Sequence, residues 1–139
     1  MLTSTLYYSS SESAFPGTPE ATGHRSEPHF GVRWKVVAII DEHTEYHGQM
    51  KDISVNGASI LLPVNLRDIA SFDLVIHIPA LHTERESHLV YIKGSQIYTV
   101  YDCNENAFRT SVEFREFKSN HDIGFLMNRL NKHYHALGQ

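Results

Sequence analysis

The segment from Asp52 to Gly57 groups a carboxylate, a hydroxyl and a glycine within six residues. Asp52 and Ser54 carry oxygen atoms that can accept hydrogen bonds from the N–H edge of a ligand. Gly57 has no side chain, so another group can approach its backbone closely. The same residues could instead form a turn that binds nothing, because short polar side chains bond backbone N–H groups about two residues further on. The spacing therefore predicts a tight turn that either contacts a ligand or only joins two strands.

Alternating apolar and polar residues on both sides of this turn predict a mostly β structure. An apolar residue at every second position is typical of half-buried antiparallel strands. The clearest runs cover residues 34–40, 58–62, 72–78 and 108–114. We expect two further strands over 87–93 and 96–101, joined by a turn at 94–95, and another turn over 102–106.

The spacing of apolar residues changes near the C-terminus. Ile123, Met127, Leu130 and Tyr134 recur at helical intervals, and Ser119 can cap the start of a helix. We therefore expect an amphipathic helix over about residues 118–136. Many short strands with one helix favour a barrel or sandwich, with the helix covering an open end or a sheet edge.

Length and composition limit the class of protein. The 139 residues suffice for one domain with a core, and the net charge of −4 argues against a general nucleic-acid binder. One cysteine excludes an internal disulfide. We see no signal peptide and no stretch long enough to span a bilayer, so we expect a cytoplasmic protein without membrane insertion. Residues 1–28 are rich in Ser, Thr, Glu, Pro and Gly, and we expect them to be flexible.

The intact turn motif, the order of the strands and the final helix together resemble the PilZ domain family. The resemblance runs over about residues 24–135. It implies an all-β fold with a terminal helix, namely a six-stranded antiparallel β-barrel followed by a C-terminal α-helix. We therefore expect a flexible N-terminal segment over 1–28 and a barrel domain over 29–139.

PilZ domains also carry an Arg-x-x-x-Arg motif about twenty residues before the turn, and this chain has a degenerate form of it. In one alignment Arg25 takes the first position and His29 the second. In the other, His29 takes the first position and Arg33 the second. We prefer the first, because 30–34 resembles the stretch that follows the motif in the family, but the second stays open. Histidine cannot reproduce the planar fork with which arginine binds a phosphate or a guanine edge.

The resemblance implies a receptor for the bacterial second messenger cyclic di-GMP. Such a protein acts as a signalling adapter, regulating motility, pili, chemotaxis or biofilm functions through a bacterial protein partner. The residues implied in ligand binding are Arg25, His29, Arg33, Asp52, Ser54 and Gly57. We expect no cofactor besides this ligand. The alternative is a PilZ-like protein–protein interaction module that does not bind nucleotide. A small barrel that binds RNA or single-stranded DNA is disfavoured by the negative charge.

The histidines and the cysteine raise a metal and an enzyme hypothesis, and we favour neither. His43 and His47 are four residues apart, but they lie in a predicted hairpin, where that spacing aligns nothing. His133 and His135 are two apart on the predicted helix and face different ways. The chain lacks the common nucleophile, phosphate-loop and zinc-protease motifs, and Cys103 reads as an ordinary thiol. We therefore expect no metal site, no catalytic residue and no enzyme activity.

Overall fold

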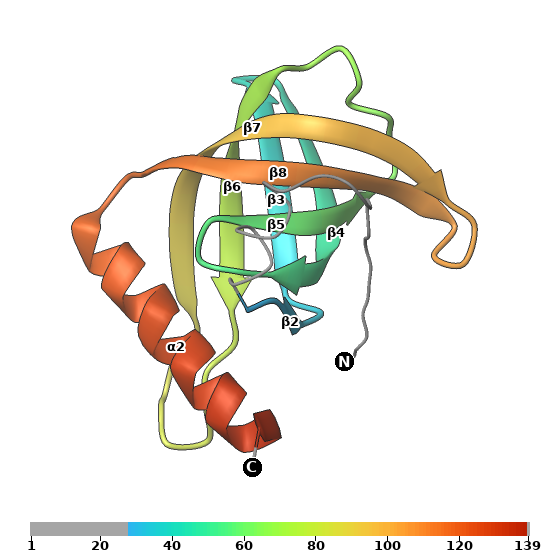
Figure 1. Ribbon diagram of the computed structural model, residues 1–139. Helices are drawn as coiled ribbons and strands as arrows, with labels where there is room; N and C mark the ends of the chain where they lie inside the picture. The colour runs from blue at the N-terminus through green and yellow to red at the C-terminus, as the bar shows by residue number, and fades with distance from the viewer. Residues whose placement is uncertain (1–27, 139) are drawn as a thin grey trace, which may run out of the picture.

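The computed structural model describes residues 28–138, and the side chains of residues 28–132. Seven strands precede one helix in the described part of the chain (Figure 1). The strands are β2 (Phe30–Gly31), β3 (Lys35–Asp41), β4 (Thr44–Ile53), β5 (Gly57–Leu62), β6 (Ser71–Ile78), β7 (His88–Asp102) and β8 (Ala107–Phe117). The helix is α2 (Asn120–Gly138).

Six of the strands close into an antiparallel barrel. The order is β4, β3, β6, β7, β8 and β5, and β5 pairs back to β4. β4 makes this closure possible because its first part pairs with β3 and its last part with β5. The short β2 adds to β4 beyond the end of the β3 pairing. The expected six-stranded barrel with a C-terminal helix is therefore confirmed, with β2 as one extra strand.

The barrel interior is filled by the residues that alternate along the strands. On β6, the apolar side chains of Phe72, Leu74, Ile76 and Ile78 are all buried. The same period of two places Val36, Ala38, Ile60 and Val112 in the core. Burying an aliphatic side chain of this size contributes roughly 1.5–3 kcal/mol, which makes the barrel core the main source of stability.

β7 differs from the sequence-based expectation. Residues 87–93 and 96–101 were expected as two strands with a turn at 94–95, but they form one strand of 15 residues. Two β-bulges, next to Lys93 and next to Gln96, bend this strand and make a turn unnecessary. Gly94 is needed for packing, because an added Cβ would lie 2.6 Å from Cγ1 of Val112. The glycine thus marks a bend within a strand rather than the end of one.

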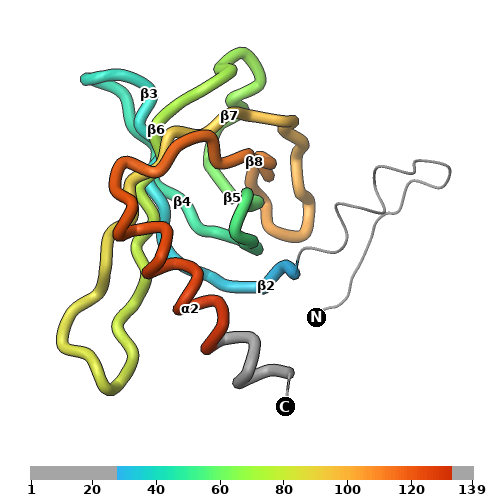
Figure 2. The backbone as a smooth tube through the Cα atoms, turned by 60° about the vertical axis from the view of Figure 1, so that its left-hand side comes forward, coloured from blue at the N-terminus to red at the C-terminus, as the bar shows by residue number. Residues whose placement is uncertain are grey.

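The helix α2 lies against one side of the barrel, beside β7 and β8 (Figure 2). Leu126 and Leu130 on its inner face are buried. Arg129 is buried as well, and its guanidinium donates hydrogen bonds to the carbonyl of Pro79, at 2.7 Å, and to both carboxylate oxygens of Glu84. These bonds tie the connection between β6 and β7 to the helix. Among the described residues, no helix is long and apolar enough to cross a membrane.

Candidate functional site

The turn between β4 and β5 is held by its own atoms. The N–H of Ser54 donates to the carbonyl of Gly57 at 2.8 Å, and the Ser54 hydroxyl accepts from the N–H of Asn56 at 3.3 Å. The Ser54 side chain is buried, with only 1% of the residue exposed. The predicted tight turn is therefore present, and the buried Ser54 stabilises it through hydrogen bonds to other residues of the turn.

Gly57 is required at its position by the neighbouring strand. A Cβ added to Gly57 would lie 2.5 Å from the carbonyl oxygen of Val112 on β8. Backbone atoms cannot move aside cheaply, so only glycine allows β5 to pair with β8 at this point. The close approach of the β8 backbone thus explains why this residue is a glycine.

Asp52 lies next to His29, although 22 residues of sequence separate them. The pairing of β2 with β4 sets Gly31 opposite Asp52 and so carries His29 to the same edge. The distance from Nδ1 of His29 to Oδ1 of Asp52 is 3.7 Å, and the two side chains are 57% and 36% exposed. The structure therefore brings together, on an open surface, one residue of the degenerate Arg-x-x-x-Arg motif and one residue of the turn motif.

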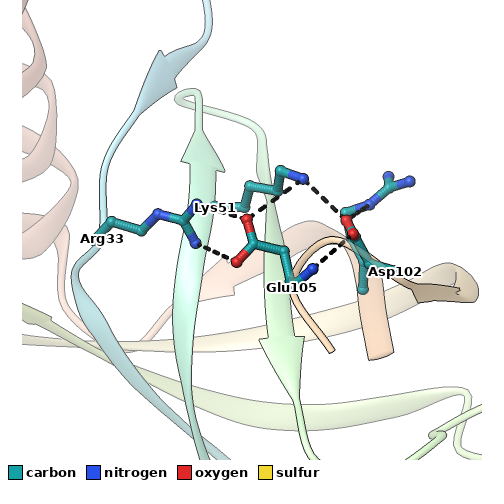
Figure 3. A network of polar contacts seen from close by, with 5 residues as sticks. Arg33, Lys51, Asp102 and Glu105 are labelled. Carbon is teal, nitrogen blue, oxygen red and sulfur yellow. Dashed lines mark hydrogen bonds and ion pairs between the residues drawn. The ribbon is translucent and has the colours of Figure 1, made fainter. Parts of the chain in front are cut away.

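Arg33 contacts the turn between β7 and β8 through Glu105 (Figure 3). Its two terminal nitrogens approach the two carboxylate oxygens of Glu105, at 3.3 and 2.6 Å. This bidentate geometry is the strong form of the arginine–carboxylate contact. The guanidinium of Arg33 therefore already has an anionic partner.

Glu105 belongs to a larger polar network that the sequence did not predict. Lys51 donates to Asp102 at 2.9 Å and lies 3.7 Å from Glu105 (Figure 3). The Nε of Arg109 donates to the same oxygen of Asp102 at 3.2 Å. The network joins β4, β8 and the segment before β3 to the β7–β8 turn. The turn itself was predicted, but contacts between residues as far apart as Lys51 and Asp102 leave no local sequence signal.

The cations of the network lower the pKa values of both acidic residues. For Glu105, the hydrogen bond from Arg33 is the main cause, and burial partly opposes it. For Asp102, burial raises the pKa, but hydrogen bonds from Lys51 and from the N–H of Glu105 outweigh it and leave the pKa below its usual value. Both carboxylates are therefore stabilised as anions at neutral pH.

Replacing Asp102 with Asn should destabilise the protein at neutral pH and have less effect in acid. The ordinary pKa of an aspartate is 3.8, and the folded protein lowers it at this position. The contribution of the ionised Asp102 carboxylate to the stability of the fold is therefore fully present above about pH 4. It is lost as the pH falls through the lower pKa that Asp102 has in the folded protein. Urea unfolding of the parent and of Asp102→Asn should show a stability difference that narrows steadily below about pH 4. A constant difference down to about pH 2 would contradict this role of the network.

The other candidate residues fall into two groups. Arg25 lies outside the described residues, and so do the side chains of His133 and His135. His43 and His47 lie in the β3–β4 hairpin, as expected, where each contacts a neighbouring glutamate. Within residues 28–132, no three His, Cys, Asp or Glu side chains are grouped so that they could hold a metal ion.

A groove of about 550 Å³ lies between the 54–57 turn, the end of β8 and helix α2. Val55 and Asn56 of the turn line one side, and Ile123 and Met127 of the helix line the other. Neither His29 nor Asp52 lines it. The groove and the predicted ligand residues therefore share the turn but are separate features.

The barrel, its terminal helix and the turn after β4 define a PilZ-type domain. The PilZ domain family matches residues 24–123, and the chain belongs to this family. The matched range includes Arg25, His29 and Arg33 as well as the whole turn motif. The prediction of the family from the sequence is thus confirmed.

The solved structures that are similar to this chain include the following two. One is the inhibitor of motility MotI/DgrA from Bacillus subtilis, with a TM-score of 0.70 and 15% identity over 83% of this chain and 53% of the other. The second is MrkH from K. pneumonia in complex with c-di-GMP, with a TM-score of 0.49 and 16% identity over 79% of this chain and 54% of the other. At such low identity the first likeness establishes the fold alone. The chain spans about half the length of these two proteins, and no curated protein matches it.

Proposed function

We propose that this chain is a receptor for cyclic di-GMP that acts as a signalling adapter rather than as an enzyme. Membership of the PilZ family supports the class of ligand. The observation that carries the proposal is the position of His29 beside Asp52, because one residue from each of the two motifs then lies at the same exposed edge of the barrel. The pairing of Arg33 with Glu105 favours the alignment in which Arg25 and His29 stand for the two arginines.

The chemistry of the site suits a ligand with guanine bases and phosphates. The ionised carboxylate of Asp52 only accepts hydrogen bonds, and the Watson–Crick edge of guanine supplies N–H donors. Arg25 would contribute a planar fork for a phosphate or for the other guanine edge. His29 would stack on a base, or donate to a phosphate when it is protonated. Ser54 and Gly57 would act mainly by fixing the turn that presents Asp52.

Arg33 would contribute only after a rearrangement. Its guanidinium must leave Glu105 before it can reach a phosphate, so part of any binding energy would be lost in breaking that pair. We therefore rank Arg33 below Arg25 as a ligand residue. Such a rearrangement would also uncouple the segment before β3 from the β7–β8 turn, which offers a route from ligand to protein partner.

A second candidate is a PilZ domain that binds a protein partner and no nucleotide. The engagement of Arg33 with Glu105 favours it, because His29 stands in place of an arginine and Arg33 already binds a carboxylate. The remaining arginine of the motif, Arg25, lies outside the described residues. In either case we propose a cytoplasmic adapter in motility, pili, chemotaxis or biofilm control, with a bacterial protein as the downstream partner.

Isothermal titration of the full chain with cyclic di-GMP separates the two candidates, and Asp52→Ala tests the site. Losing a charged hydrogen-bond partner of the ligand should cost about 1.5–3 kcal/mol, or roughly tenfold to a hundredfold in affinity. Asp73→Ala on β6 is the matched control, because Asp73 is similarly exposed and β6 does not border the turn. The control should bind as the parent does. If the parent releases no heat at high micromolar ligand, the receptor proposal is wrong.

A further inference from the structure

One part of β7 has a neighbouring strand on one side only. The pairing of β7 with β6 ends at Ser95, and the last backbone bond on that side runs from the N–H of Gln96 to the carbonyl of Ala70. The pairing with β8 continues as far as Asp102. Among the described residues, the stretch 97–102 therefore presents an unpaired backbone edge. In an antiparallel strand, the N–H and C=O groups of alternate residues point toward such an edge.

Most side chains of this edge are hydrophobic and exposed, and the exceptions are Thr99 and Asp102. Ile97 is 60% exposed, and Tyr98, Val100 and Tyr101 are each at least 41% exposed. No charged residue occurs from Gly94 to Tyr101. Natural proteins usually protect an open edge with a lysine, a proline or an inward-pointing charge, and this stretch has none of them. The first charge is Asp102, which is turned toward Lys51 and Arg109.

The edge is also held in place. Figure 1 shows the hairpin of β7 and β8 continuing past the end of β6 and away from helix α2. At its far end, Asp102 and Glu105 are bonded to Lys51 and Arg33 of the barrel wall. A strand fixed at both ends loses little conformational freedom when another strand pairs with it, which favours association.

We propose that the 97–102 edge of β7 pairs with the same edge of a second copy of this chain. An open edge bonds to an extended backbone, and two identical strands that run antiparallel complement each other about a two-fold axis. Such an interface closes at two copies. Because residues 97–101 are uncharged, the pairing sets no like charges opposite each other, and the exposed tyrosines and aliphatic side chains cover one another. The proposal does not depend on nucleotide binding.

The mass of the full chain in solution, measured by light scattering over a concentration series, tests the dimer. The parent should move from 15.9 kDa toward twice that mass as concentration rises. Tyr98→Lys should weaken dimer formation at least tenfold, because the two-fold axis brings two added charges close together. Tyr91→Lys is the matched control: it lies on the same strand and is also 45% exposed, but Tyr91 is paired with Val75 of β6, and its carbonyl accepts a bond from Lys118. The control should dimerise as the parent does.

Cys103 gives an independent measurement. It is the only cysteine, it is exposed, and it directly follows the proposed edge. A spin label on Cys103 in each copy should give an inter-label distance on the order of 25 Å, because an antiparallel pairing centred on 97–102 separates the two positions by about seven residues. A chain that stays monomeric to high micromolar concentration would overturn the proposal. A dimer that tolerates Tyr98→Lys, or that separates the labels by more than about 50 Å, would also overturn it.

Discussion

Replacing Gly48 with alanine should destabilise the barrel by about 3 kcal/mol. Gly48 lies on β4 near its crossing from β3 to β5, and an added Cβ would lie 2.0 Å from the carbonyl oxygen of Leu61. The same atom would lie 2.9 Å from Cδ2 of Leu62 in the core. Because the closest contact is backbone, β4 and β5 must separate to admit the methyl group. Urea unfolding monitored by fluorescence should show a clearly lower midpoint with an unchanged slope.

Gly124→Ala is a control for which we expect the opposite change in stability. Gly124 is an exposed residue of α2, and an added Cβ would meet nothing within 4 Å. Alanine is favoured over glycine within a helix by up to about 1 kcal/mol, so this variant should be more stable than the parent. Equal effects of the two substitutions, or a tolerated alanine at 48, would show that the β4–β5 spacing is wider than described.

The second large effect concerns affinity, and it rests on the proposed function. His29→Arg restores the Arg-x-x-x-Arg spacing with Arg25 and should tighten binding of cyclic di-GMP about tenfold to a hundredfold, or create it where the parent shows none. The physical reason is that an arginine fork can bond a phosphate through two donors, whereas one imidazole nitrogen offers a single donor. Calorimetric titration of parent and variant at neutral pH measures the difference.

His43→Arg is the matched control for that gain. It makes the same chemical change at an exposed position in the β3–β4 hairpin, where the neighbouring charge is Glu42 rather than Asp52. General attraction of the anionic ligand to an added positive charge would strengthen both variants alike. If Arg25→Ala has no effect and Arg33→Ala abolishes binding, the alignment that pairs His29 with Arg33 is the correct one.

The barrel could be predicted from the sequence because apolar and polar residues alternate along each strand, which indicates that one face of the strand is buried. The same signal failed for β7, where a Gly-Ser pair suggested a turn and bulges keep the strand continuous. The two-residue strand β2 is too short for any periodicity, so its pairing with β4 was not predicted. That pairing is what sets His29 beside Asp52, and it was therefore accessible only through the three-dimensional structure.

The candidate site was predicted in part for a similar reason. The residues of the turn are contiguous, and their types alone predict a bend. The partners of Arg33, by contrast, come from a hairpin 72 residues away, and nothing near Arg33 indicates that Glu105 will meet it. Sequence patterns thus identify the groups that could meet a ligand, but not which of them already bind another part of the protein.

The contacts of Gly57 and Ser54 have a consequence for surveys of genomes. Both residues are needed to build the junction of β4, β5 and β8, so selection for folding alone would retain them in a lineage that no longer senses a messenger. The turn motif alone then indicates the barrel fold, whereas the Arg-x-x-x-Arg motif indicates the ability to bind the ligand. A count of receptors that relies only on the turn motif would therefore include PilZ domains that no longer bind the messenger.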